Sequence, residues 1–184
     1  MFSLRPCWPT IRLVAFLFVA VVFRPALAVA GPAACTDFMN SMAQSLPDQH
    51  VQFEHPLLVS RSAPSLGIEV YDLVTTGRVD GTLHCRRDHL VRFEAKISLP
   101  ADQQVQRGFD KVQQTAITAA LNWPMARAAS TLRGMNNEAG EYLRASIERG
   151  DVYLAGKTES HENGTDLGMV WTKTDRTFII SRPE

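Results

Sequence analysis

The N-terminal segment constrains the rest of the chain most, because it has the pattern of an export signal. Arg5 and Arg12 precede an unbroken apolar run over residues 13–23, and the small residues over 26–30 then offer two cleavage sites. The apolar run is about half as long as the roughly 20 residues that a membrane-spanning helix needs. We therefore expect a cleaved signal over 1–30, with an uncleaved anchor as the alternative.

The rest of the chain, residues 31–184, has the size of one domain, and a core of that size needs no metal to stabilise it. The whole chain has 19 basic and 19 acidic residues, and the signal contains three arginines and no acidic residue. The remaining domain then has 16 basic and 19 acidic side chains. A nucleic-acid-binding surface usually concentrates Lys and Arg on one face, so we expect no nucleic-acid partner.

The predicted export decides how the cysteines pair. Cys7 lies in the signal, which leaves Cys35 and Cys85 as an even pair in an oxidising compartment. We predict a Cys35–Cys85 disulfide, and closing a loop of about 50 residues would stabilise the fold by about 4 kcal/mol. Two alternatives are weaker. Lipidation of Cys35 would require a motif such as Leu-Ala-Gly-Cys, whereas Pro-Ala-Ala precedes it, and a redox-active dithiol would require Cys-x-x-Cys.

A short helix and a weak strand are predicted first. Apolar residues at helical spacing indicate a helix over 36–46, which Thr36 and Asp37 can cap and Pro47 ends. The alternation that follows over 51–60 is interrupted by a proline, so it predicts an edge strand at best.

The next three segments alternate between apolar and polar residues, as antiparallel strands with one buried face do. They cover residues 68–76, 82–86 and 90–99, with a turn expected at Asp80-Gly81. The residues expected on the buried face are Leu83, Cys85, Val91, Phe93, Ala95 and Ile97. The pattern predicts a meander with Cys85 directed inward, as a buried disulfide requires.

Two longer helices follow the meander. An apolar stripe over 105–119 predicts the first, and Asn122-Trp123-Pro124 separates it from the second, for which Gly150 is the expected C-cap. The stripe of the second helix comprises Met125, Ala128, Leu132, Met135, Ala139, Tyr142 and Ser146, widened by Leu143 and Ile147.

A second meander ends the chain, with strands expected over 152–158, 167–172 and 177–181 and a turn at Asn163-Gly164. Helices segregated from antiparallel strands indicate an α+β fold. We expect two layers, in which an antiparallel sheet of about six strands in two meanders carries the two longer helices on one face.

The two meanders resemble each other loosely. Residues 80–82 precede the Ile-Ser pair at 97–98 by the same spacing as 163–165 precede the Ile-Ser pair at 180–181. The apolar positions between these segments do not match, so a chance likeness and an ancient duplication both stay open.

The densest group of reactive side chains is His84-Cys85-Arg86-Arg87-Asp88-His89. Neighbouring residues on a strand point to opposite faces, so His84 and Cys85 cannot both ligate one metal ion without a β-bulge. We therefore predict an exposed hairpin tip and no metal site. The side chains that could face an acidic partner or an anionic lipid are Arg86, Arg87, His89 and Arg92. Ordinary solvation of these residues is the simpler interpretation.

The sequence contains no Gly-x-Ser-x-Gly motif, and no serine has a lysine three residues after it. A carboxylate pair for glycan hydrolysis would converge only in three dimensions. We expect a bacterial protein of the periplasm or cell exterior that binds an envelope component or a partner protein, without catalysis and without a cofactor. Two alternatives stay open: a carrier that holds a small apolar ligand beside Met125 and Met135, and a small periplasmic hydrolase.

Overall fold

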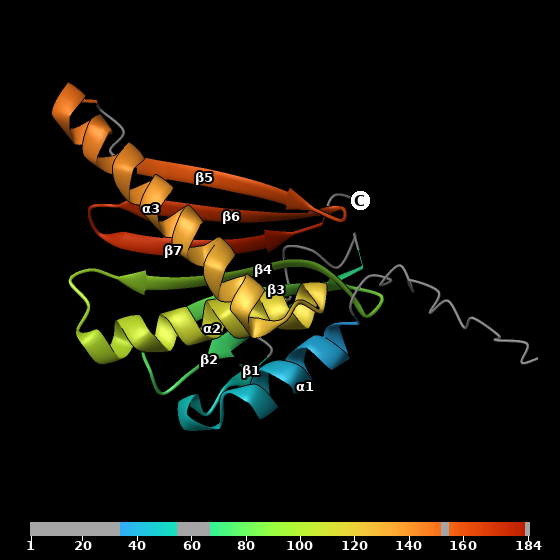
Figure 1. Ribbon diagram of the computed structural model, residues 1–184. Helices are drawn as coiled ribbons and strands as arrows, with labels where there is room; N and C mark the ends of the chain where they lie inside the picture. The colour runs from blue at the N-terminus through green and yellow to red at the C-terminus, as the bar shows by residue number, and fades with distance from the viewer. Residues whose placement is uncertain (1–33, 55–66, 152–154, 183–184) are drawn as a thin grey trace, which may run out of the picture.

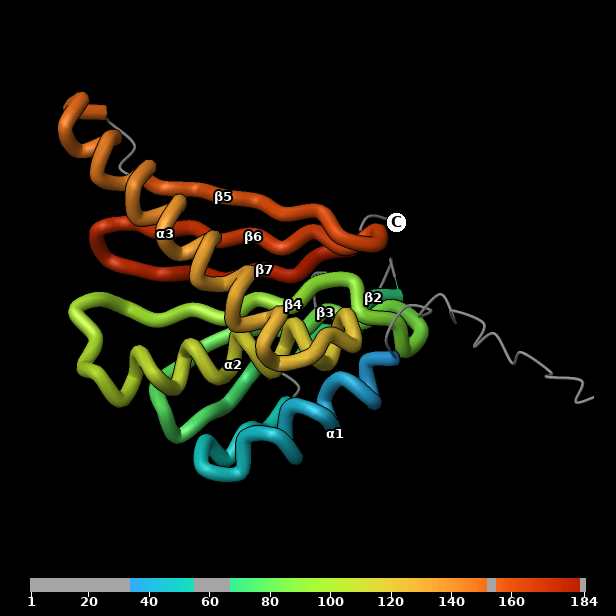
Figure 2. Tube along the Cα trace, in the orientation of Figure 1, coloured from blue at the N-terminus to red at the C-terminus, as the bar shows by residue number. Residues whose placement is uncertain are grey.

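In the computed structural model, the described residues 34–54, 67–151 and 155–182 form one antiparallel sheet with a layer of helices on one face (Figures 1 and 2). The helices are α1 (Cys35–Ser45), the short 3-10 helix η1 (Pro47–Gln49), α2 (Gln103–Leu121) and α3 (Met125–Arg149). The strands are β1 (Gln52–Glu54), β2 (Ile68–Val74), β3 (Asp80–Arg86), β4 (His89–Ser98), β5 (Ala155–Glu162), β6 (Thr165–Thr172) and β7 (Asp175–Ser181). The predicted α+β two-layer architecture is confirmed.

Some predictions fall outside the described residues. These are the signal over 1–30, the second half of the weak strand over 55–60, and the first residues of the strand expected over 152–158. Among the described helices, none is long and apolar enough to cross a membrane.

The strand order β1-β2-β3-β4-β7-β6-β5 joins the two meanders through their last strands. β4 and β7 pair in the middle of the sheet, from Arg92 opposite Ser181 to Ser98 opposite Asp175. The sheet has seven strands rather than about six, because β1 pairs with β2 and adds an edge strand.

The inner face of the sheet, which the helices cover, holds the hydrophobic core. Leu83 and Phe93 from the sheet and Val112 from α2 have no exposed surface. The ring of Phe38 in α1 packs against that of Phe93, with 5.2 Å between the ring centroids. The predicted division of the sheet into one buried and one wetter face is therefore confirmed.

One stretch of β4 departs from the predicted alternation. Val91 is half-buried, and Leu90 takes its expected place in the core with 2% of its surface exposed. The cause is a β-bulge, since His84 pairs with Arg92 whereas the next residue, Cys85, pairs with Leu90. A strict alternation of two residues contains no signal for such an extra residue.

The predicted turn at Asp80-Gly81 is wrong, because both residues belong to β3. The turn between β2 and β3 lies earlier, where Thr75 Oγ1 donates to the carbonyl oxygen of Val79 (3.1 Å) and accepts from its N–H (3.1 Å). Gly81 serves a different purpose. A Cβ at this position would overlap the backbone carbonyl oxygen of Glu94 on β4, so the glycine lets two strands approach closely.

Other predicted chain reversals are confirmed. Arg87-Asp88 and Asn163-Gly164 have positive φ at both residues, as the two-residue hairpin turns that match strand twist require. Gly150 ends α3 in the left-handed conformation with φ of 72°.

The stripe predicted for α3 is correct along its centre and wrong at three positions. Met125, Tyr142 and Ile147 have 46%, 57% and 44% of their surface exposed. The buried residues of the helix are Ala128, Leu132, Met135, Ala139 and Ser146. Figure 1 shows why the far end is exposed: α3 crosses the sheet diagonally and extends past the start of β5.

α3 lies against β5 with almost no space between the two backbones. A Cβ at Gly156 would overlap the carbonyl oxygen of Ala139 and lie 2.7 Å from the backbone nitrogen of Leu143. On the neighbouring strand, the ring of Trp171 lies under Gly140, where a Cβ would be 3.0 Å from the ring. Small residues on both surfaces therefore set the height of this helix above the sheet.

Candidate binding groove

Two residues of the reactive cluster over 84–89, Cys85 and Asp88, bind the start of α1, and we call this pair the clamp. Cys35 and Cys85 form the predicted disulfide, with 6.1 Å between their Cα atoms. The Asp88 carboxylate accepts hydrogen bonds from the backbone N–H of Thr36 (2.9 Å) and from its hydroxyl (2.8 Å). These two bonds, the backbone one first, lower the pKa of Asp88 below its ordinary value.

The predicted capping of this helix by Thr36 and Asp37 is wrong. The N-cap residue of α1 is Ala34, which offers no side chain to the first turn, and Thr36 donates to Asp88 instead of capping its own helix. Asp88, 52 positions away in the sequence, thus supplies the hydrogen-bond acceptor that the N-terminus of α1 needs. Because the sulfur of Cys35 is bonded to Cys85, it is not available to carry a lipid.

The hairpin tip does bring the predicted basic residues together on β3, β4 and the turn between them. These residues are Arg86, Arg87, His89 and Arg92. Their charge is partly balanced, since Arg92 pairs with Glu94 at 2.9 Å and Asp88 shares the turn. In the part of the chain that the structure describes, no group of three or more His, Cys, Asp or Glu side chains could hold a metal ion.

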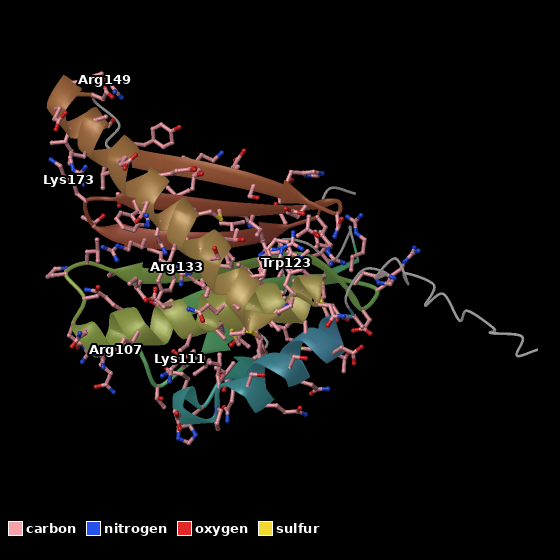
Figure 3. The ribbon with its side chains drawn as sticks, viewed as in Figure 1. Arg107, Lys111, Trp123, Arg133, Arg149 and Lys173 are labelled. Atoms are coloured by element: carbon pink, nitrogen blue, oxygen red, sulfur yellow. A yellow bond between two sulfur atoms is a disulfide. The ribbon has the colours of Figure 1, made fainter. Side chains whose placement is uncertain are left out.

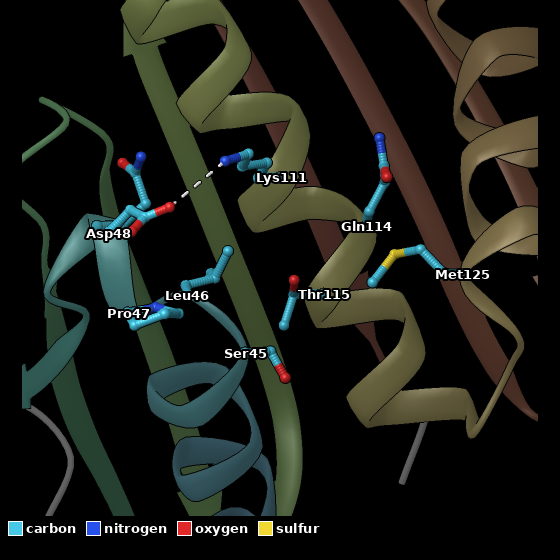
Figure 4. A pocket seen from close by; sticks show the side chains of 9 residues that line it. Ser45, Leu46, Pro47, Asp48, Lys111, Gln114, Thr115 and Met125 are labelled. Atoms are coloured by element: carbon cyan, nitrogen blue, oxygen red, sulfur yellow. Dashed lines mark ion pairs between the residues drawn. The ribbon is translucent and has the colours of Figure 1, made fainter.

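Away from the clamp, a groove runs between η1 and α2. Its first part is a pocket of about 240 Å³ where α1 and η1 face α2 and the start of α3 (Figure 4). Lys111 and Asp48 stand on opposite walls, with 4.0 Å between Nζ and Oδ2. The lining residues are Ser45, Leu46, Pro47, Asp48, Gln49, Lys111, Gln114, Thr115 and Met125.

The second part is a pocket of about 630 Å³ that continues toward the beginning of α2. It shares Asp48, Gln49 and Lys111 with the first pocket, so the two form one groove. Its other lining residues are Asp102, Gln103, Gln104, Arg107 and Gly108. Arg107 and Lys111 are one helical turn apart and lie along the same side of α2 (Figure 3).

Gln49 forms the floor of the groove. Its backbone oxygen accepts from the N–H (3.0 Å) and the hydroxyl (3.1 Å) of Thr76, which ties η1 to the β2–β3 turn. Its side-chain Oε1 fits between Gly77 and Gly108, where any Cβ would meet it. This oxygen is buried and accepts no hydrogen bond within the described residues. Two glycines thus keep open the space in which Gln49 lies.

The side chains that line the groove are carboxamides and hydroxyls with a few charged and apolar groups. Among the described lining residues there is neither His nor Cys, so the hydroxyls of Ser45 and Thr115 have no neighbouring imidazole as a base. Asp102 uses its carboxylate to cap α2, accepting from the N–H of Val105 at 2.8 Å. The Asp48 and Lys111 side chains are 83% and 58% exposed, so their ion pair is weak and a ligand can displace it.

Sequence reasoning did not find this groove. It singled out Met125 and Met135 as a ligand-binding pair, but Met125 lies at the mouth of the first pocket while Met135 is 4% exposed in the core. The local signal for it was the run of polar residues Asp102, Gln103 and Gln104, the N-cap and first two residues of α2, which all line the second pocket. Compared with protein-family models, with curated proteins and with solved structures, the chain has no match.

Proposed function

We propose that this chain is an exported binding protein without catalytic activity, whose groove between η1 and α2 holds a segment of a partner protein in the bacterial envelope. The make-up of the groove carries the proposal. Amide side chains and two opposite charges adjoin a small apolar surface, and the described lining residues include no nucleophile with a base beside it. A few polar groups beside an apolar surface orient a bound segment without reacting with it.

A polypeptide segment fits the lining better than an anionic ligand does. The positive charges of Arg107 and Lys111 are balanced by Asp48 and Asp102, so the groove has no excess of one sign. Carboxamide side chains donate and accept hydrogen bonds as a peptide backbone does. The carboxamides along the groove are Gln49, Gln103, Gln104 and Gln114.

The apolar end of the groove suits one side chain of the bound segment. Leu46 and Pro47 form one wall of the first pocket, and Met125 faces them from α3 (Figure 4). Methionine adapts its shape to different apolar partners, which is useful where a side chain has to be accepted from solvent. The 46% exposure of Met125 supports this role, because large exposed apolar side chains often mark binding surfaces.

The proposed location rests on the disulfide and on the N-terminal pattern. A Cys35–Cys85 disulfide fits a periplasmic or extracellular location, because such bonds persist in oxidising compartments. We expect cleavage of the signal to place the mature N-terminus between Val29 and Cys35. Intact mass measurement on protein from a bacterial envelope fraction, with and without reduction and alkylation, tests both points. A full-length mass, or a thiol that alkylates before reduction, contradicts the proposal.

The groove is tested by partner capture with two matched charge reversals. Lys111→Glu places a negative charge opposite Asp48, whereas Arg133→Glu makes the same change on an exposed residue of α3 that lines neither pocket. We expect envelope proteins cross-linked to the wild-type chain to be retained by Arg133→Glu and lost by Lys111→Glu. Equal retention by both variants would show that the partner binds elsewhere.

A further inference from the structure

The two edges of the sheet differ in length. β1 has three residues, whereas β5 has eight and, within the described residues, pairs on one side alone, with β6. An unpaired edge of this length presents a row of backbone N–H and C=O groups that can pair with another strand. β5 is therefore the edge at which the described sheet can be extended.

α3 presents an exposed aromatic side chain beside this edge. The hydrogen bond from Thr158 Oγ1 to Glu138 Oε2, at 2.6 Å, shows which side of α3 faces β5. Tyr142 follows Glu138 by four residues and lies on the same side of the helix. It is 57% exposed, more than any other large apolar or aromatic residue among the described ones. A strand that pairs with β5 would therefore lie next to the Tyr142 ring.

The charges on β5 are complementary to those on a second β5. Lys157 and Glu159 share one face of the strand, on either side of Thr158, and form an ion pair with each other. They are 62% and 63% exposed, so this pair is weak and a residue of another strand can replace either partner. In an antiparallel pair centred on Thr158, Lys157 of one copy stands directly opposite Glu159 of the other, and the reverse pair forms on the far side. Charges on an edge strand usually prevent pairing, but here their alternating sign favours this one register.

We propose that a second copy of this chain docks on β5 as an antiparallel strand, with Thr158 on the two-fold axis, so that two sheets become one. The symmetry of such a dimer is closed, because the same edge is used by both copies. The register places Gly156 beside Ser160 of the second copy. Ser160 is half-buried and lies on the face that Tyr142 approaches, so the tyrosine covers it in the dimer.

Sedimentation of the mature chain over a range of concentrations tests the proposal. We expect a dimer for the wild type. Lys157→Glu replaces both attractive cross-strand pairs by repulsive ones, which should weaken association about tenfold or more. The double variant Lys157→Glu with Glu159→Lys restores opposite charges across the axis and should restore the dimer. Lys173→Glu, in the β6–β7 turn (Figure 3), is the matched control and should leave the dimer unchanged.

Each outcome decides the proposal. A wild-type chain that stays monomeric at its highest soluble concentration overturns it, and so does a dimer that Lys157→Glu does not weaken. The exposed positions of both residues keep these variants folded, which circular dichroism verifies. Lys111→Glu in the groove should leave the dimer intact, so that failure of the dimer and failure of the proposed partner binding are separate results.

Discussion

At one end of the sheet, α1 has 11 residues and is bonded covalently to β3, whereas at the other end α3 has 25 residues and is held to β5 and β6 by non-covalent contacts. Around α1 the contacts are specific bonds, namely the disulfide and the Asp88 acceptor. Around α3 they are mainly close contacts at Gly156 and Gly140, with a hydrogen bond from Thr158 to Glu138 on the same side. The same sheet thus fixes its helices in two different ways.

The difference follows from helix length. Helices shorter than about 12 to 15 residues are marginal in water even with favourable sequences, so α1 needs bonds from outside itself. α3 is long enough to bury a continuous stripe, and its cap at Gly150 completes it locally. The disulfide therefore stabilises α1, which is too short to bury as much apolar surface as α3.

Removal of the disulfide should have the largest effect. Replacing Cys35 and Cys85 together by serine should lower the free energy of unfolding by about 4 kcal/mol, because the loop of about 50 residues is no longer closed in the unfolded chain. Chemical denaturation of the variant, and of the wild type with reductant, measures this change. Hydrogen exchange should speed up in α1 more than in α3. Equal denaturation midpoints with and without reductant would show that the disulfide does not stabilise the fold.

A methyl group at the α3 contact should have the next largest effect. Gly156→Ala forces the new Cβ against the backbone of Ala139 and Leu143, which should cost about 1–3 kcal/mol of unfolding free energy. Gly134→Ala is the matched control, because no atom beyond the neighbouring backbone of its own helix lies within 4 Å of a Cβ there, and alanine favours a helix interior over glycine by about 1 kcal/mol. We expect the midpoint of thermal unfolding to fall for Gly156→Ala and to rise for Gly134→Ala. A higher midpoint for Gly156→Ala would refute the close packing of α3 on β5.

The smallest effect should be a dependence on pH at the hairpin end. Burial, and next the charge of Arg92, lower the pKa of His84 below its ordinary value of 6.5. The unfolded chain then binds this proton more readily, so stability should be full above about pH 6.5 and fall as the pH drops through the lower pKa of the folded state. His84→Gln should reduce this loss between about pH 7 and 5, by less than about 1 kcal/mol. If the free energy of unfolding depended on pH in the same way for the wild type and the variant, this effect of His84 would be excluded.

The comparison also bears on the likeness between the two meanders. Asn163-Gly164 is the turn between β5 and β6, whereas Asp80-Gly81 lies inside β3 and the equivalent turn comes earlier. The two dipeptides are therefore not equivalent positions in the fold. What the halves share is the pairing of their last strands, β4 with β7.

Local patterns were sufficient to predict most of the elements. Helical spacing, proline positions and Gly150 predicted α2 and α3, and alternation predicted the buried face that holds Cys85. Tyr142 and Ile147 were misassigned, because helical spacing shows which residues share a side and not where the sheet ends. The groove was missed for a similar reason, since Gln49, Gly77 and Gly108 meet only after three separate elements pack.

Taken alone, the amino-acid sequence determines most of the features that depend on neighbours within a few residues, namely the longer helices, most of the strands and the turns at Arg87-Asp88 and Asn163-Gly164. It also determines the disulfide, because the cysteine count beyond the signal pattern leaves one pairing. The tertiary structure decides those that need a partner far along the chain. Asp88 accepts from Thr36, a bulge places Leu90 in the core, and Gly81 and Gly156 admit a second backbone. The physical reason is that periodicity records which face a residue takes, whereas caps, bulges and close approaches depend on what lies opposite that face.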